Sequence, residues 1–214
     1  MKSISFLEGF LGSPLDWNEV IQSFQTPWNC RFSSEFSTDF VVGYSMGGRI
    51  ALDQLAKGRV RPSALVLIAA HPGLITEEEK SARRTFENNW LSILDQESVD
   101  TFLKKWYAQP LFSKLQCIPP HRFTLTKEEI RHSFLKFSIL KQHPLWDFLS
   151  NCSVPVLYIA GEKDMKYRGI AEKLKHMNPH LQTAIVQGAS HAVHLEKPLE
   201  VAHLLESFFC DYFE

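Results

Sequence analysis

The chain has 214 residues, of which 44% are hydrophobic and 22% are charged, and its formal net charge is −1. This composition is typical of one sizeable globular core and is short for two. The near-neutral charge argues against a nucleic-acid partner, and no apolar run reaches the roughly 20 residues that span a bilayer. We therefore expect no nucleic-acid and no membrane partner.

The cysteines and the first residues indicate a cytoplasmic protein. The four cysteines, Cys30, Cys117, Cys152 and Cys210, are far apart and form no CxxC pair. This spacing favours reduced structural thiols over a metal cage or a disulfide framework. The opening MKSISFL has one lysine and too short an apolar stretch for a signal peptide, so we interpret it as a strand.

Strand and helix signals alternate in the first third of the chain. Residues 3–7 predict a short buried strand, and a turn-rich loop leads to a helix with Asp16 as its N-cap. Residues 39–43 predict a second strand, followed at once by a helix. Residues 64–69 form an apolar run typical of a parallel strand covered on both faces. Residues 26–38 show no clear period.

The middle of the chain changes character. Residues 77–148 carry charged and aromatic side chains at helical spacing, which predicts a helical insertion. Later signals predict strands over 154–160 and 182–187 and helices over 168–176 and 197–209. Strands that alternate with helices imply an α/β fold with a mostly parallel sheet. The predicted organisation is a core of residues 1–75 and 149–214, with a helical cap over 76–148.

A serine stands in the pattern of a nucleophile elbow. Gly43-Tyr44-Ser45-Met46-Gly47 follows the second strand signal and precedes the helix-forming RIALDQLA. Glycines at both ends of G-x-S-x-G let strand and helix pack closely while the serine is held above the sheet. The alternative is a tight turn with an incidental serine. The context favours a reactive Ser45 and an α/β-hydrolase fold.

A serine needs a neighbouring imidazole, and the imidazole needs an acid that fixes its tautomer. The order on this fold is Ser, then Asp or Glu, then His. Asp164 and His191 each follow a strand signal at the expected place, so we predict them as the catalytic partners of Ser45. The rivals are Glu162, His71 and His194; we expect His194 to orient the loop through Glu196.

The remaining site residues are backbone donors and cations. An oxyanion hole would use the N–H groups of Met46, after the serine, and Phe10, in the loop after the first strand. Arg49 lies one helical turn beyond Ser45 and could bind a carboxylate, or could be a surface residue. The same two interpretations apply to Arg83 and Arg84.

The chain resembles the MenH family of α/β-hydrolase-fold synthases, which make 2-succinyl-6-hydroxy-2,4-cyclohexadiene-1-carboxylate in menaquinone biosynthesis. The matching stretches are GFLGSPLDW, GYSMGGR, HPGL, EKSARR, WYAQPLF, GEKDMKY and SHAVHLEKP, which are spread over almost the whole chain.

The resemblance implies a lyase in which the serine abstracts a proton and pyruvate is eliminated, with no cofactor. It implies a small polycarboxylate substrate. It also implies Ser45, Asp164 and His191 as catalytic residues. The implied substrate contacts are Tyr44, Arg49, Arg83, Arg84 and Arg122, with Trp106, Tyr107 and Phe112 on the cap side.

Two departures from the family pattern bear on activity. Glu8 stands where the family has a histidine, and few residues precede Ser45, which predicts a sheet shortened on its N-terminal side. The alternatives to the synthase are a carboxylesterase or thioesterase on the same triad, and a non-catalytic protein that keeps the fold.

Overall fold

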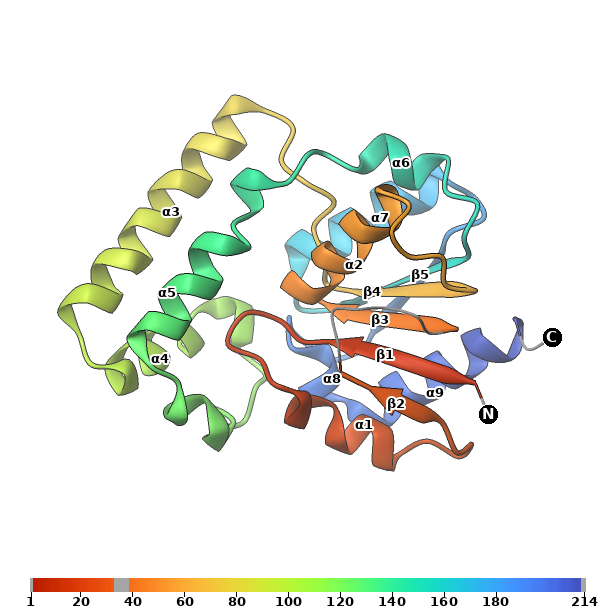
Figure 1. Cartoon of the computed structure of the whole chain (residues 1–214), viewed down its shortest axis with the longest axis horizontal. Coiled ribbons are helices and arrows are strands. Elements are labelled where there is room, and N and C mark those ends of the chain that lie inside the picture. Colours follow the sequence, from red (N-terminus) through yellow and green to blue (C-terminus); the bar gives the residue numbers. More distant parts are fainter. Residues whose placement is uncertain (1, 33–38, 213–214) are drawn as a thin grey trace.

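The structure is a computed structural model that describes residues 2–32 and 39–212. Within these residues the centre is an all-parallel sheet of six strands in the order β2-β1-β3-β4-β5-β6 (Figure 1). The strands are β1 (Ser3–Leu7), β2 (Asn29–Arg31), β3 (Phe40–Tyr44), β4 (Ala64–Ile68), β5 (Val156–Gly161) and β6 (Gln182–Val186). The predicted parallel sheet is confirmed. The aperiodic stretch 26–38 contains the unpredicted strand β2, and its residues 33–38 lie outside the described residues.

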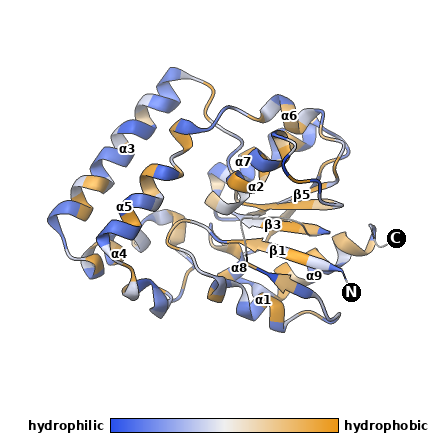
Figure 2. Ribbon diagram, in the orientation of Figure 1, coloured by the Kyte–Doolittle hydropathy of each residue, from blue (hydrophilic) through white to orange (hydrophobic). Residues whose placement is uncertain are grey.

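The central strands are apolar because helices cover both faces of the sheet. Every residue of β1, β3, β4 and β5 is buried, and these strands are the hydrophobic band in Figure 2. Successive side chains of β3 enter opposite cores: Phe40 and Val42 enter one and Val41 the other. One face carries α1 (Asn18–Gln22), α8 (Val193–Glu196) and α9 (Pro198–Cys210). The other carries α2 (Met46–Ala56), α6 (Trp146–Ser150) and α7 (Met165–Met177).

The N-terminal edge of the sheet is short and is held by α9. Strand β2 has three residues and pairs only with β1 among the described strands. The carboxylate of Glu206 on α9 accepts the N–H groups of Gln25 and Thr26 at 3.0 and 2.8 Å. Trp28 packs edge-on against Phe40, with 5.7 Å between ring centroids. A short, anchored edge strand offers little backbone for pairing with another sheet.

Helices α3 (Glu77–Gln96), α4 (Val99–Tyr107) and α5 (Lys127–Lys136) lie beyond the carboxyl ends of the strands (Figure 1). We call residues 77–141, which include these helices and three 3₁₀ turns, the cap. Capping boxes at Thr76 and Thr126 begin α3 and α5. None of the described helices has the length and apolar character needed to cross a lipid bilayer.

A buried ion pair joins the cap to the core. Asp16 Oδ2 accepts Arg122 Nη2 at 2.8 Å, and both side chains are almost fully buried. The prediction that Asp16 is a helix N-cap is wrong. Ser13 caps the 3₁₀ turn Pro14–Trp17, and Asp16 accepts the Ser13 N–H from the third position of that turn. Sequence spacing could not reveal this because the second partner, Arg122, is 106 residues away.

Asp16→Asn should destabilise the protein by about 3 kcal/mol or more, because it leaves a buried guanidinium without its counter-ion. Urea unfolding followed by fluorescence measures this change. The matched control is Lys105→Gln, which breaks an exposed pair with Glu97 and should change stability by less than about 1 kcal/mol. Equal effects of the two variants would contradict a structural role for the buried pair.

His194 is a neutral part of the core behind the serine turn. Its ring is 0% exposed and lies between Trp17 and Tyr44, with centroid distances of 4.5 and 4.3 Å. Both ring nitrogens lack a hydrogen-bond partner among the described residues. Burial lowers the pKa of His194 to about 3. Glu196 accepts its hydrogen bonds from Ser190 and none from His194. The expectation that His194 orients the loop through Glu196 is therefore wrong.

Acid should therefore weaken the fold through His194. The unfolded chain binds the proton first, near the ordinary pKa of 6.5. Stability from the neutral ring is complete above that pH and falls by up to about 1.4 kcal/mol per pH unit towards pH 3. His194→Phe should flatten this dependence in urea titrations between pH 7 and 5. His203→Gln, an exposed α9 variant, should not; a wild-type slope in both would refute the assignment.

Candidate active site

The turn between β3 and α2 holds Ser45 in a strained backbone conformation. Its φ and ψ are 49° and −107°, a region that side-chain-bearing residues rarely adopt. The Ser45 N–H donates to the carbonyl of Ile68 at 2.8 Å, which ties the turn to β4. A Cβ on Gly47 would lie 2.5 Å from the Leu7 and Glu8 carbonyl oxygens. No larger residue fits at Gly47, so the elbow requires glycine at this position of the G-x-S-x-G pattern.

The structure brings Ser45, His191 and Asp164 together. Ser45 Oγ is 3.1 Å from His191 Nε2, and His191 Nδ1 is 2.7 Å from Asp164 Oδ2. Asp164 and His191 are each 3% exposed, whereas Ser45 is half-buried. An ionised Asp164 requires the proton on Nδ1, so Nε2 is free to accept the Ser45 proton. The arrangement is competent for general-base catalysis or for nucleophilic attack.

The rival acid and base lie in other contacts. Glu162 accepts the Gly188 N–H at 2.9 Å and pairs with Lys163. His71 accepts the Gly73 N–H on its Nδ1 at 3.1 Å, and burial lowers its pKa to about 3. Neither makes a hydrogen bond with Ser45 or His191.

The two predicted backbone donors flank the elbow. Met46 is the first residue of α2, and the first N–H groups of a helix have no partner within the helix. Phe10 lies in the loop after β1, and its ring contacts Trp106 and Phe134 of the cap at 4.9 and 5.0 Å. A groove beside them, between this loop and α5, is lined by Glu8, Gly9, Leu11, Gly12, Met46, Leu125, Glu129, Ile130, Ser133 and Phe137. Glu8 therefore brings a carboxylate to the groove next to the elbow.

Arg49 is a half-buried cation on the first turns of α2. Its Nη2 donates to the Phe137 carbonyl at 2.6 Å, and its Nη1 donates to Gln142 Oε1 at 3.1 Å. Burial is the main cause that lowers the pKa of Arg49 to about 10; the charge of Arg83 acts in the same direction and that of Glu87 opposes it. Both hydrogen-bond partners are neutral, so the guanidinium has no bound counter-ion among them.

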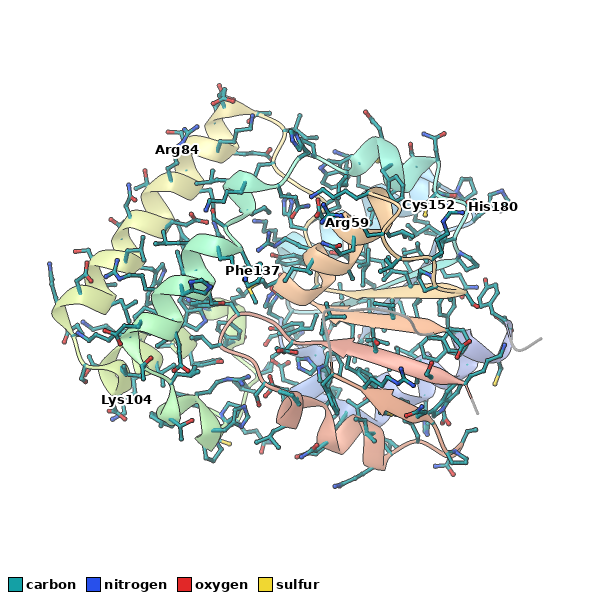
Figure 3. The ribbon with its side chains drawn as sticks, viewed as in Figure 1. Arg59, Arg84, Lys104, Phe137, Cys152 and His180 are labelled. Atoms are coloured by element: carbon teal, nitrogen blue, oxygen red, sulfur yellow. The ribbon has the colours of Figure 1, made fainter. Side chains whose placement is uncertain are left out.

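The other predicted arginines differ in their surroundings. Arg83 is half-buried and pairs with Glu87 at 2.6 Å. Arg84 is exposed, points outward from α3 and lies 3.5 Å from Glu77, so the structure does not bring it to the elbow (Figure 3). Arg122 is occupied by Asp16 and donates from Nε to Tyr107 at 2.9 Å.

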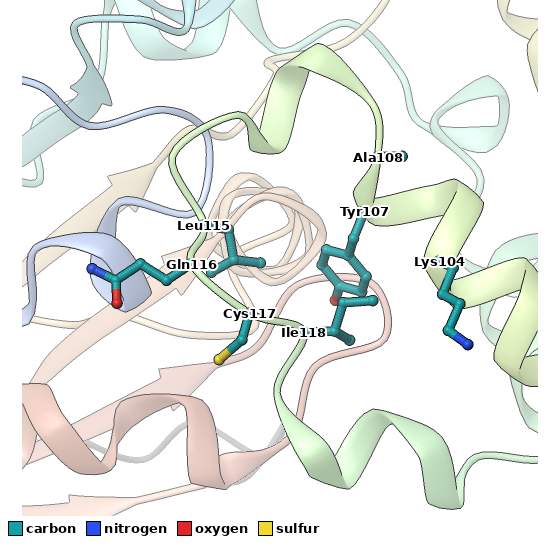
Figure 4. A pocket seen from close by; sticks show the side chains of 7 residues that line it. All are labelled: Lys104, Tyr107, Ala108, Leu115, Gln116, Cys117 and Ile118. Atoms are coloured by element: carbon teal, nitrogen blue, oxygen red, sulfur yellow. The ribbon is translucent and has the colours of Figure 1, made fainter.

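The three predicted cap aromatics lie in different surroundings. Phe112 lies 5.9 Å from the His191 ring, measured between centroids. Trp106 is buried among cap side chains and touches the site only through Phe10. Tyr107 lines a separate pocket in the cap, with Lys104, Ala108, Leu115, Gln116, Cys117 and Ile118 (Figure 4).

Tyr167 is a site residue that the sequence reasoning missed. Its ring lies 4.7 Å from that of His191, and its N–H donates to Asp164 at 3.4 Å. Burial and the Asp164 charge raise its pKa to about 12, so it remains a neutral phenol. Its position three residues after the predicted acid Asp164, on the helix that Asp164 caps, is the signal that could have revealed it.

The described residues contain no cluster of three or more His, Cys, Asp or Glu side chains that could hold a metal ion. The four cysteines are free. Cys30 and Cys152 are half-buried, and burial raises the pKa of both, that of Cys30 to about 11. Cys117 and Cys210 are exposed.

Known proteins resemble this chain in sequence and in fold. A model of the alpha/beta hydrolase family matches residues 7–204. The putative 2-succinyl-6-hydroxy-2,4-cyclohexadiene-1-carboxylate synthase of Haemophilus influenzae is 30% identical over 235 aligned positions, which cover 92% of each chain. The structure of MenH from S. aureus has a TM-score of 0.87 at 22% identity and covers 99% of this chain and 94% of its own.

Esterases share the same architecture. An esterase from Thermogutta terrifontis with malate bound has a TM-score of 0.72 at 16% identity, covering 100% of this chain and 91% of its own. At such identities the structural likeness shows the fold alone. The family match and the Haemophilus relative confirm the resemblance that the motifs predicted. The chain belongs to the alpha/beta hydrolase family.

Proposed function

We propose that this protein is a lyase similar to 2-succinyl-6-hydroxy-2,4-cyclohexadiene-1-carboxylate synthase, which releases pyruvate from a polycarboxylate precursor. The observation that carries the proposal is the contact of Ser45 with His191, combined with the half-buried Arg49 one helical turn away. The similarity to relatives that bear this name supports it.

In the proposed reaction His191 Nε2 accepts the Ser45 proton, and the serine oxygen removes a proton from a ring carbon of the substrate. The electron pair forms a ring double bond, and the C–O bond to the pyruvyl group breaks. The released enolate takes up a proton and becomes pyruvate. Asp164 stabilises the imidazolium, and the N–H groups of Met46 and Phe10 face developing negative charge.

Carboxylate recognition falls to Arg49, with Arg83 and the Tyr44 hydroxyl as further contacts. A carboxylate at Arg49 would exchange neutral partners for a charged one, and charge-assisted hydrogen bonds are the stronger kind. Burial keeps the Tyr44 pKa well above 10, so its hydroxyl remains a donor.

The second candidate is a carboxylesterase or thioesterase, in which Ser45 would attack an ester carbonyl. The structural likeness to several esterases supports it. An esterase requires an acyl-enzyme, whereas the lyase does not, and this difference is measurable.

Ser45→Ala should abolish pyruvate release from the pathway precursor, because it removes the atom that takes the proton. A coupled lactate dehydrogenase assay measures the product. The loss should be on the order of a thousandfold or more, as for other triad members. In parallel, p-nitrophenyl esters of varied length test the alternative. Ester turnover by a wild-type protein that releases no pyruvate would refute the synthase.

Arg49→Ala should reduce kcat/KM, because a charged hydrogen bond to substrate is lost. The reduction should correspond to a loss of about one to three kcal/mol of transition-state stabilisation. Arg84→Ala is the matched control, since its guanidinium is exposed on α3, and should leave kcat/KM within about twofold. An Arg49 variant with the wild-type kcat/KM would remove this residue from the binding site.

A further inference from the structure

The loop that carries His191 is fixed by a carboxylate on α8, the helix that follows this loop. Glu196, on α8, accepts the Ser190 N–H on Oε2 and the Ser190 hydroxyl on Oε1, each at 2.5 Å. Ser190 is 1% exposed and directly precedes His191. Charge-assisted bonds of this kind are about twice as strong as neutral ones, so Glu196 restrains the backbone next to the imidazole.

The cap holds the same loop from the other side. The His191 N–H donates to the carbonyl of Leu111 at 3.1 Å, and the Lys114 N–H donates to Ser190 Oγ at 3.4 Å. Leu111 and Lys114 lie in and just after the 3₁₀ turn Pro110–Phe112.

The Ser190 hydroxyl therefore links the cap to helix α8. It accepts a hydrogen bond from the cap and donates one to Glu196. Donation to a carboxylate makes a hydroxyl oxygen a better acceptor, because hydrogen bonds in a chain polarise one another. A chain thus runs from the Lys114 amide through Ser190 to Glu196, beside the residue that must reach Ser45.

We propose that Glu196 is the positioning residue of His191, and that Ser190 couples the position of the imidazole to the docked cap. Glu196 makes no hydrogen bond to the reacting groups and acts through Ser190. The inference rests on the proposed triad chemistry but not on pyruvate as the product. It requires that loss of Glu196 affects turnover more than substrate binding, and that loss of the Ser190 hydroxyl loosens the cap at Lys114.

Glu196→Gln tests the first part, with Glu200→Gln as the matched control. Glu200 is exposed on α9 and pairs with Lys197 at 3.6 Å. The amide cannot accept on both of its atoms and carries no charge, so one Ser190 bond is lost or reversed and the other is weakened. We expect kcat to fall about tenfold to a hundredfold with KM within about twofold, as a displaced catalytic group produces. The control should retain the wild-type kcat.

A proton NMR signal reports the same geometry without any substrate. The Nδ1 proton between His191 and Asp164 should give a strongly deshielded resonance, assigned by its loss in His191→Gln. In Glu196→Gln this resonance should broaden through faster exchange with water, while circular dichroism shows an intact fold. Unchanged kcat and an unchanged resonance would overturn the positioning role, whether or not the wild-type protein releases pyruvate.

Ser190→Ala tests the coupling to the cap. Amide hydrogen exchange should accelerate at Lys114 and His191 in this variant, and at neither residue in Glu200→Gln. Wild-type exchange rates at both amides in Ser190→Ala would overturn the proposed coupling.

Discussion

The site depends on one hydrogen bond, from His191 Nδ1 to Asp164 at 2.7 Å. That bond requires two loops from different strands to meet, and the register of β5 with β6 brings Gly161 opposite Val186 at their carboxyl ends. Gly161 makes the meeting possible, because a Cβ there would lie 2.1 Å from the Ser190 carbonyl oxygen. The sheet register and one glycine therefore let the two loops come close enough for this bond.

The three arginines Arg49, Arg83 and Arg122 differ in whether a carboxylate already neutralises them. Arg83 already has Glu87 and Arg122 already has Asp16, so a substrate anion would compete with a carboxylate for either. Arg49 has a carbonyl and an amide as partners, and both lie in the segment between α5 and α6. A substrate carboxylate that displaced them would also change how that segment contacts α2. In the proposed reaction, substrate binding would therefore be linked to the placement of this segment through the Arg49 guanidinium.

Features that depend on residues close together in the chain were predictable from the sequence. Features that depend on contacts between residues far apart in the chain were not. The elbow at Ser45, the order Ser-Asp-His and the buried strands follow from local spacing and loop position. The roles of Asp16, Arg84 and Glu196 depend on which side chain lies opposite after folding. Arg84 and Arg83 are adjacent in sequence yet point to different surroundings. Strand β2 was missed because an edge strand of three residues has no repeating apolar pattern.

Within the part of the chain that the structure describes, the short N-terminal edge of the sheet lies away from the elbow. Ser45, Asp164, His191 and Phe10 follow β3, β5, β6 and β1, and none of these residues comes from β2. Strand β2 lies on the far side of β1 from β3, so an altered edge there leaves the register of the central strands intact. Glu8 is a different matter, because it lines the groove beside Met46. The polyanionic substrate proposed above would place its carboxylates on the Arg49 side of the elbow and its uncharged part towards Glu8, since like charges repel.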